Sequence, residues 1–118
     1  MIYKDFCQVK LMLASLNQLE ESVLQGCQMH MNHAMVLCVI FSKGPQTPTA
    51  LSKELHVSPP RISRLLNSLV QDRFIERVSD QTDQRSRSVV LTTLGKKKAQ
   101  EIQRLEKKLF PWSVKIEE

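Results

Sequence analysis

The chain has 118 residues, 17 Lys and Arg against 12 Asp and Glu, and a formal net charge of +5, which at about 100–150 residues per domain predicts a single domain. Its longest apolar run, residues 34–41, is far shorter than the ~20 residues of a membrane-spanning helix, and its first residues lack the pattern of a secretory signal. Three cysteines without framework spacing argue against a disulfide-rich secreted fold, so we expect a soluble protein of a reducing compartment, the cytoplasm.

Two helices are predicted in the N-terminal half. Apolar residues recur at helical spacing over residues 3–25, and Gly26 is predicted to end this helix. Residues 29–42 are apolar on nearly all sides, which predicts a second helix buried at the centre of the domain. The breaker Lys43-Gly44-Pro45 follows.

Two shorter helices with the same start signal come next. The first begins at Thr47, a predicted N-cap followed by proline, and runs to Leu55. The second begins in the same way at Ser58, is predicted to be capped by that side chain, and runs to about Asp72. Its apolar side consists of Ile62, Leu65, Leu66, Leu69 and Val70. Its opposite side carries Arg61, Ser63, Arg64 and Asn67.

A hairpin and a last helix complete the chain. Residues 74–78 and 89–92 are predicted strands, separated by a polar, turn-rich segment over residues 79–88. Thr92 or Thr93 is predicted to cap a helix with the apolar stripe Leu94, Ala99, Ile102, Leu105 and Leu109. The fold class predicted by these elements is mainly α with a small β-hairpin.

The positive charge is concentrated in one segment. Residues 61–98 contain nine Lys and Arg but four Asp and Glu, which accounts for the whole excess of five. Clustered positive charge is typical of a surface that binds a polyanion, although a solvated face that binds nothing has the same composition.

The pair of short helices is a helix-turn-helix candidate. The second helix of such a motif fits the major groove of DNA, which is about 12 Å wide. Arg pairs with guanine and Asn with adenine, so Arg61, Arg64 and Asn67 are predicted to contact bases. Ser58, Ser63 and the free N–H groups of the helix start can hold phosphates.

The charged hairpin directly after this motif has the arrangement of a wing. Arg85 or Arg87 could enter the minor groove, and Asp83 could orient Arg85 through a salt bridge. The alternative for Asp83 and Arg85 is a surface ion pair of under about 1 kcal/mol. Residues 96–98, three lysines, could follow backbone phosphates or only solubilise the helix.

These positions together resemble the MarR family of winged-helix transcription regulators. The resemblance covers roughly residues 29–110. Its strongest part is Asp80-x-x-Asp83-x-Arg85-x-x-x-Val89-x-Leu91-Thr92-x-x-Gly95, supported by the segments Met29–Leu37, Thr47–Leu55, Val57-Ser58, Arg61–Leu69 and Phe74–Arg77. It implies a homodimeric bacterial repressor or activator on a palindromic operator, a second helix in the major groove and Arg85 in the minor groove. The predicted DNA-binding set is Thr47, Ser58, Pro60, Arg61, Ser63, Arg64, Asn67, Arg77, Asp83, Arg85, Arg87 and Lys97.

The resemblance also implies that the first and last helices form the dimer interface. Within a single winged-helix domain, residues 1–28 would be the N-terminal dimerisation helix, 29–92 the DNA-binding core and 93–118 the C-terminal dimerisation helix. The apolar stripes that lack partners in so small a domain are Phe6, Val9, Leu13, Leu16, Ile102, Leu105 and Leu109. The sequence departs from the family pattern at two places. The chain stops soon after Trp112, so a further C-terminal dimerisation helix is expected to be absent or shortened, and His33 stands where the family often has Gln.

Several residues are candidates for sensing. Cys7 lies where hydroperoxide-sensing relatives place a reactive cysteine, and its alternative role is that of a small interior residue. Cys38 is predicted to be core. Cys27, His30 and His33 are spread over roughly 120° of a continuous helix, too wide for one metal ion without distortion, although Gly26 could free Cys27 or a second subunit could add a ligand. Packing and helix-start roles are favoured over a zinc site, and no metal and no cofactor are expected. A small-molecule effector is implied by the family, but the sequence identifies no pocket for it.

Three classes of function therefore compete. A sequence-specific DNA-binding regulator is the leading hypothesis, with a thiol-based redox sensor using Cys7 as a variant of it. A winged-helix module that binds a partner protein is the alternative. An enzyme is disfavoured, because the sequence has no nucleophile elbow, phosphate-binding glycine loop or paired catalytic carboxylates.

Overall fold

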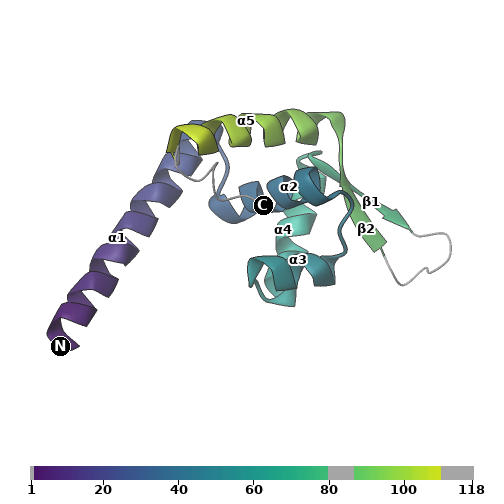
Figure 1. The fold of residues 1–118 in the computed structure, drawn as a ribbon. Coiled ribbons are helices and arrows are strands. Elements are labelled where there is room, and N and C mark those ends of the chain that lie inside the picture. The colour runs from purple at the N-terminus through teal and green to yellow at the C-terminus, as the bar shows by residue number, and fades with distance from the viewer. Residues whose placement is uncertain (1, 80–86, 110–118) are drawn as a thin grey trace.

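The computed structural model describes residues 2–79 and 87–109. Five helices and one hairpin follow in the order α1 (Ile2–Cys27), α2 (Met31–Lys43), α3 (Pro48–Leu55), α4 (Pro59–Gln71), β1 (Ile75–Ser79), β2 (Arg87–Leu91) and α5 (Thr93–Leu109) (Figure 1). The predicted fold class, mainly α with a small hairpin, is confirmed. None of the helices within these described ranges has the length and apolar character needed to cross a membrane.

Helix α2 is the centre of the hydrophobic core. Val36 and Leu37 are fully buried, and Ala34 and Ile40 are nearly so. Helices α3 and α5 and strand β2 pack around it, as the all-round apolar sequence predicts. The helix begins two residues later than predicted, since Met29 is buried in the elbow between α1 and α2.

Helices α3 and α4 form the predicted helix-turn-helix. The Thr47 side chain accepts a hydrogen bond from the Ala50 N–H at 3.1 Å and so caps α3. His56 ends α3 with a left-handed backbone (φ 55°), and the buried Val57 completes the turn. The predicted side-chain cap of α4 is wrong: the Ser58 side chain makes no capping hydrogen bond. The two prolines that follow it have no N–H to donate, which removes most of the reason for that cap.

The hairpin pairs its strands antiparallel, with Ile75 opposite Leu91 and Ser79 opposite Arg87. Its strands occupy residues 75–79 and 87–91, against the predicted 74–78 and 89–92. Gln46 and Val89 exchange two backbone hydrogen bonds, of 2.8 and 3.2 Å, which attach the segment before α3 to the free side of β2. The hairpin tip, residues 80–86, lies outside the described residues.

Thr92 fixes the hairpin to the helices on either side of it. The Thr92 hydroxyl donates a hydrogen bond of 2.7 Å to the Arg73 carbonyl. The same oxygen accepts a hydrogen bond of 3.0 Å from the Gly95 N–H, so Thr92 is the cap of α5. A Cβ at Gly95 would overlap the Phe74 carbonyl, so this crossing requires glycine. Leu94, predicted on the apolar stripe, is instead exposed, because Gly95 and not Leu94 faces the core here.

Helix α1 extends away from the rest of the molecule (Figure 1). Gly26 does not end this helix as predicted; it continues to Cys27, and Gln28 takes the left-handed conformation (φ 55°) after it. Gly26 lies at a close contact instead, since a Cβ there would be 2.8 Å from the Leu105 methyl groups.

Candidate nucleic-acid interface

Helix α4 presents one polar side to solvent. Ile62, Leu66 and Leu69 are buried on its inner side. Pro60, Arg61, Ser63, Arg64 and Asn67 are exposed. The predicted outward direction of the candidate base-reading residues is therefore confirmed, and the burial of the apolar stripe is what holds them in that direction.

Asn67 has a partner that the sequence did not indicate. Its side-chain oxygen accepts a hydrogen bond of 2.5 Å from an Arg77 guanidinium nitrogen, which joins α4 to β1. A bidentate contact with adenine uses both the oxygen and the amide nitrogen of Asn. An amide oxygen has two lone pairs, so the bond to Arg77 holds the Asn67 side chain in place and still leaves one oxygen lone pair and the amide nitrogen for a base.

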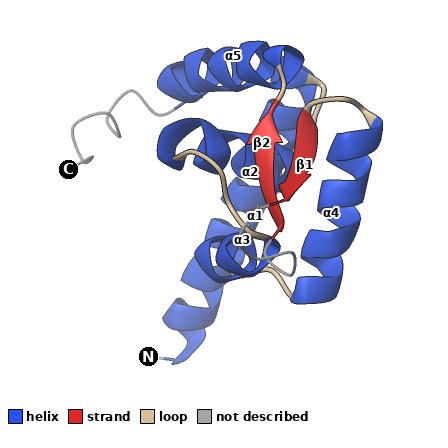
Figure 2. Cartoon of the chain, turned by 90° about the vertical axis from the view of Figure 1, so that its right-hand side faces the viewer, coloured by secondary structure: helices blue, strands red, loops and turns tan. Residues whose placement is uncertain are grey.

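The other predicted DNA-binding residues are distributed over the surface. Ser58 is exposed at the start of α4, Thr47 is half-buried and already engaged as a cap, and Arg87 is exposed at the start of β2. Asp83 and Arg85 lie outside the described residues. Lys97 is exposed near the start of α5. This part of α5 lies beside the last turn of α4, since Val70 of α4 and Lys96 of α5 line the same groove (Figure 2). The fold thus does not bring Lys97 to the Ser58 end of α4.

A crevice of mixed polar and apolar lining separates α2 from the start of α4. His33, Arg61, Arg64 and Leu65 line it. Burial lowers the pKa of His33, the neighbouring His30 lowers it further, and Asp72 opposes both. His33 is therefore neutral at pH 7, and its Nδ1 is buried without a hydrogen-bond partner among the described residues.

The candidate metal ligands are not brought together. Cys27 is fully buried and donates its S–H to the Val23 carbonyl at 3.1 Å, whereas His30 is exposed. The residues at 2–79 and 87–109 contain no group of three metal-ligating side chains.

The sequence model of the MarR family matches residues 28–86, half of the chain. These residues include α2, the helix-turn-helix, β1 and the segment that leads into β2. The chain belongs to the MarR family. The resemblance inferred from the sequence is confirmed.

Individual relatives agree with this assignment. A curated relative in Bacillus subtilis (strain 168), the uncharacterised HTH-type transcriptional regulator YwhA, is 30% identical over 92 residues, 76% of this chain and 64% of its own length. The S. aureus MepR–DNA complex has the same fold at a TM-score of 0.77 and 19% identity, over 94% of this chain and 82% of that chain. The heme sensor PefR from Streptococcus agalactiae, in complex with heme, matches at a TM-score of 0.69 and 21% identity, over 94% and 78%.

The residues predicted for a MarR-type dimer interface fall into two groups. Phe6, Val9, Leu13 and Leu16 are more than half exposed on α1. Ile102, however, is 7% exposed within its own chain, so the expectation that it lacks a partner is wrong, because α5 uses it to cover α2. Leu105 and Leu109 are half-buried.

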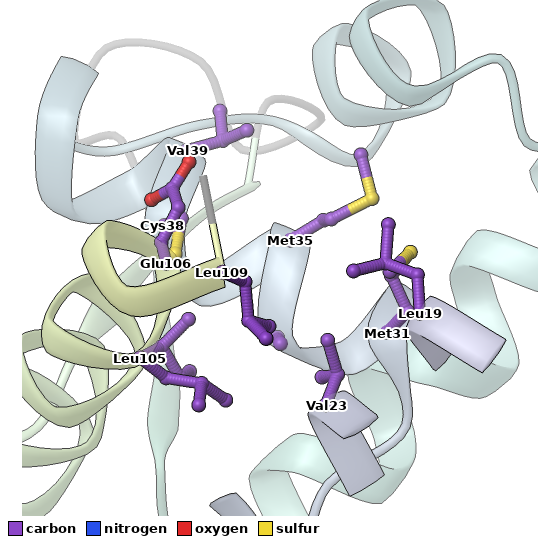
Figure 3. Close-up of a pocket in the computed structure, with 11 residues that line it drawn as sticks. Leu19, Val23, Met31, Met35, Cys38, Val39, Leu105, Glu106 and Leu109 are labelled. Carbon is purple, nitrogen blue, oxygen red and sulfur yellow. The ribbon is translucent and has the colours of Figure 1, made fainter. Parts of the chain in front are cut away.

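A groove connects these two groups. It has a volume of about 350 Å³ and is almost entirely apolar. Leu19 and Val23 of α1, Met31 and Met35 of α2, and Leu105 and Leu109 of α5 point into it (Figure 3). The groove thus continues the apolar side of α1 onto the DNA-binding part of the chain.

The three cysteines differ in environment. Cys7 is exposed on α1, so the alternative of an interior residue is wrong, and at 100° per residue it faces away from Val9 and Leu16. Cys38 is half-buried in the apolar groove, where burial and then the Glu106 carboxylate raise its pKa to about 11. Burial also raises the pKa of Cys27, which the Lys98 ammonium partly opposes.

These environments predict which thiol reacts. Because the thiolate is the reactive form, one thiol per native chain should react quickly with an aromatic disulfide at pH 8, and Cys7→Ser should abolish that fast phase. After unfolding, the Cys7→Ser variant should show two reactive thiols. A fast phase that remains in native Cys7→Ser would contradict the burial of Cys27 and Cys38.

Proposed function

We propose that this chain is a sequence-specific regulator of transcription that binds double-stranded DNA as a homodimer at a palindromic operator. The observation that carries the proposal is the polar side of α4: Arg61, Ser63 and Arg64 are exposed, while the opposite side of the same helix is fixed in the core. Such a helix fits a major groove. The concentration of the net positive charge in residues 61–98 supports a polyanionic partner.

A second copy of the chain is the partner that fits α1. Four large apolar side chains on one side of a helix form an exposed patch of a kind that soluble monomers rarely keep. Two copies related by a two-fold axis would cover each other's α1 and the groove beside it, and would set two α4 helices along one duplex.

Repression and an effector complete the proposal. A dimer on two half-sites covers at least one helical turn of operator DNA and so blocks access to it. A small apolar molecule in the groove between α1, α2 and α5 would contact both the arm and the DNA-binding part, and could change their relative orientation.

Selection of bound sites from random duplexes tests the proposal most directly. We expect a two-fold symmetric motif with half-sites about one helical turn apart. Binding should also fall steeply with salt, at about −0.9 in log–log slope for each phosphate contacted. Weak binding without sequence preference would contradict the proposal and favour the protein-interaction module.

Arg64→Ala should cost roughly 1–3 kcal/mol of binding on the selected operator and relax the base preference at one position in each half-site. The reason is the loss of a guanidinium that can bind guanine bidentately. Arg73→Ala is the matched control, because Arg73 is exposed after the opposite end of the same helix. Equal affinities of Arg64→Ala and Arg73→Ala in an operator titration would remove the reading role of Arg64.

Leu13→Glu should convert the dimer to monomers, because it places a charge in the centre of the apolar patch of α1. Gln18→Glu introduces the same charge on the opposite side of the helix and should leave the dimer intact. Sedimentation velocity measures both masses. A Leu13→Glu variant that stays dimeric would exclude this interface.

A further inference from the structure

The attachment of α1 to the rest of the chain is confined to its last two turns. From residue 5 to residue 18 every side chain of α1 is exposed, and only then do Leu19, Val23 and Cys27 enter the interior. Helix α1 makes its contacts with α5 and α2 there. The direction of the whole arm is therefore decided at one short joint.

Lys98 occupies the centre of this joint. Its ammonium group donates a hydrogen bond of 3.0 Å to the carbonyl of Cys27, the last residue of α1. The same nitrogen lies 3.3 Å from a Glu101 carboxylate oxygen and 6.0 Å from the centre of the Phe74 ring. Its side chain is only 16% exposed, so Lys98 does not share the exposure of Lys96 and Lys97 that both interpretations of the three-lysine run require.

The Lys98 ammonium group is well suited to hold the C-terminal end of α1. The terminal carbonyls of a helix have no partner within it and carry the negative end of the helix dipole, so a cation is stabilising there. Lys98 belongs to α5, and Phe74 directly precedes β1, so one side chain connects the end of α1 both to α5 and to the start of the hairpin in the DNA-binding core. Gly26 lies at the same joint, where Leu105 approaches closely.

Small rotations at this joint become large displacements at the end of the arm. With a rise of 1.5 Å per residue, the 26 residues of α1 extend about 39 Å. A rotation of about 10° would then move its far end by about 7 Å, the length of about two base-pair steps. In a dimer held through α1, the same rotation would change the separation of the two α4 helices by a similar distance. The half-sites that these helices must reach lie about 34–36 Å apart, so a change of this size would misplace one helix on its half-site.

We propose that Lys98 is a positioning residue that sets the angle between α1 and the DNA-binding core, and thereby the half-site spacing that the dimer accepts. It acts through the Cys27 carbonyl and not through DNA. The proposal concerns regulation of the operator contact and rests on the proposed homodimeric function.

The DNA test compares Lys98→Met with wild type on operators whose half-sites are at the selected spacing or displaced by one or two base pairs, and on an isolated half-site. Lys98→Met keeps the aliphatic stem but loses the donor and the charge. We expect about a tenfold loss of affinity at the selected spacing, less than about a twofold change on the half-site, and a flattened spacing profile, because loose joints lose the advantage of simultaneous binding.

Two further variants separate positioning from loss of charge. Lys98→Arg retains a donor for the Cys27 carbonyl and should restore the preferred spacing. Lys96→Met removes the same charge from an exposed position on the same helix, and any loss it causes should be equal at every spacing. A wild-type profile in Lys98→Met, or an equal flattening in Lys96→Met, would overturn the proposal.

A distance measurement tests the joint without DNA. One spin label is attached to Cys7 of α1 and a second to Thr49→Cys of α3, because both sites are exposed. Cys38→Ala removes a competing thiol, and dilution with unlabelled chain restricts the measured distance to one protomer. This distance reports the angle between α1 and the rest of the chain. Lys98→Met should broaden or shift this distance distribution, and Lys98→Arg should return it toward wild type. An unchanged distribution in Lys98→Met refutes the positioning role, whereas an asymmetric selected DNA motif refutes the proposed homodimeric function and leaves this measurement valid.

Discussion

The burial of α2 is the constraint on which the rest of the structure depends. Val36 and Leu37 are fully buried, and Ala34 and Ile40 nearly so, which leaves little of this helix for solvent. Burying one large aliphatic side chain contributes about 1.5–3 kcal/mol, so each element that covers α2 is held by it. Helices α3 and α5 and strand β2 take these places.

This arrangement gives the chain two surfaces of opposite character. Beside α2, Ile62 and Leu66 anchor one side of α4 in the core. Arg61 and Arg64 on the opposite side of the same helix therefore point into solvent. Helix α1 reaches the core only with its last turns and keeps an apolar side exposed along the rest. The separation of this polar surface from an extended apolar arm is the feature that supports the proposed dimer with two α4 helices on one duplex.

The Arg77–Asn67 hydrogen bond and the Lys98–Cys27 hydrogen bond are contacts that the sequence does not predict. Asn67 and Arg77 are ten residues apart, and Lys98 and Cys27 are 71 apart. No periodicity or short motif relates such positions, so the sequence predicts no contact within either pair. It indicates separate DNA contacts for Asn67 and Arg77, and unrelated roles for Lys98 and Cys27. The exposure of Leu94 and the burial of Ile102 were missed for a related reason, since an apolar stripe indicates a direction but not which of its residues a neighbour covers.

The sequence by itself determined the helices, the hairpin, the turn between α3 and α4 and membership of the MarR family. Each of these depends on local preferences: helical periodicity, proline after a capping residue, β-branched strands, and a motif that lies within one segment of the chain. Only the tertiary structure decided which exposed groups remain free for a partner. The reason is that contacts depend on distance in space and not on separation along the sequence. In the folded chain Lys98 contacts the end of α1, and Asn67 contacts Arg77. The Cys7 thiol is exposed on α1.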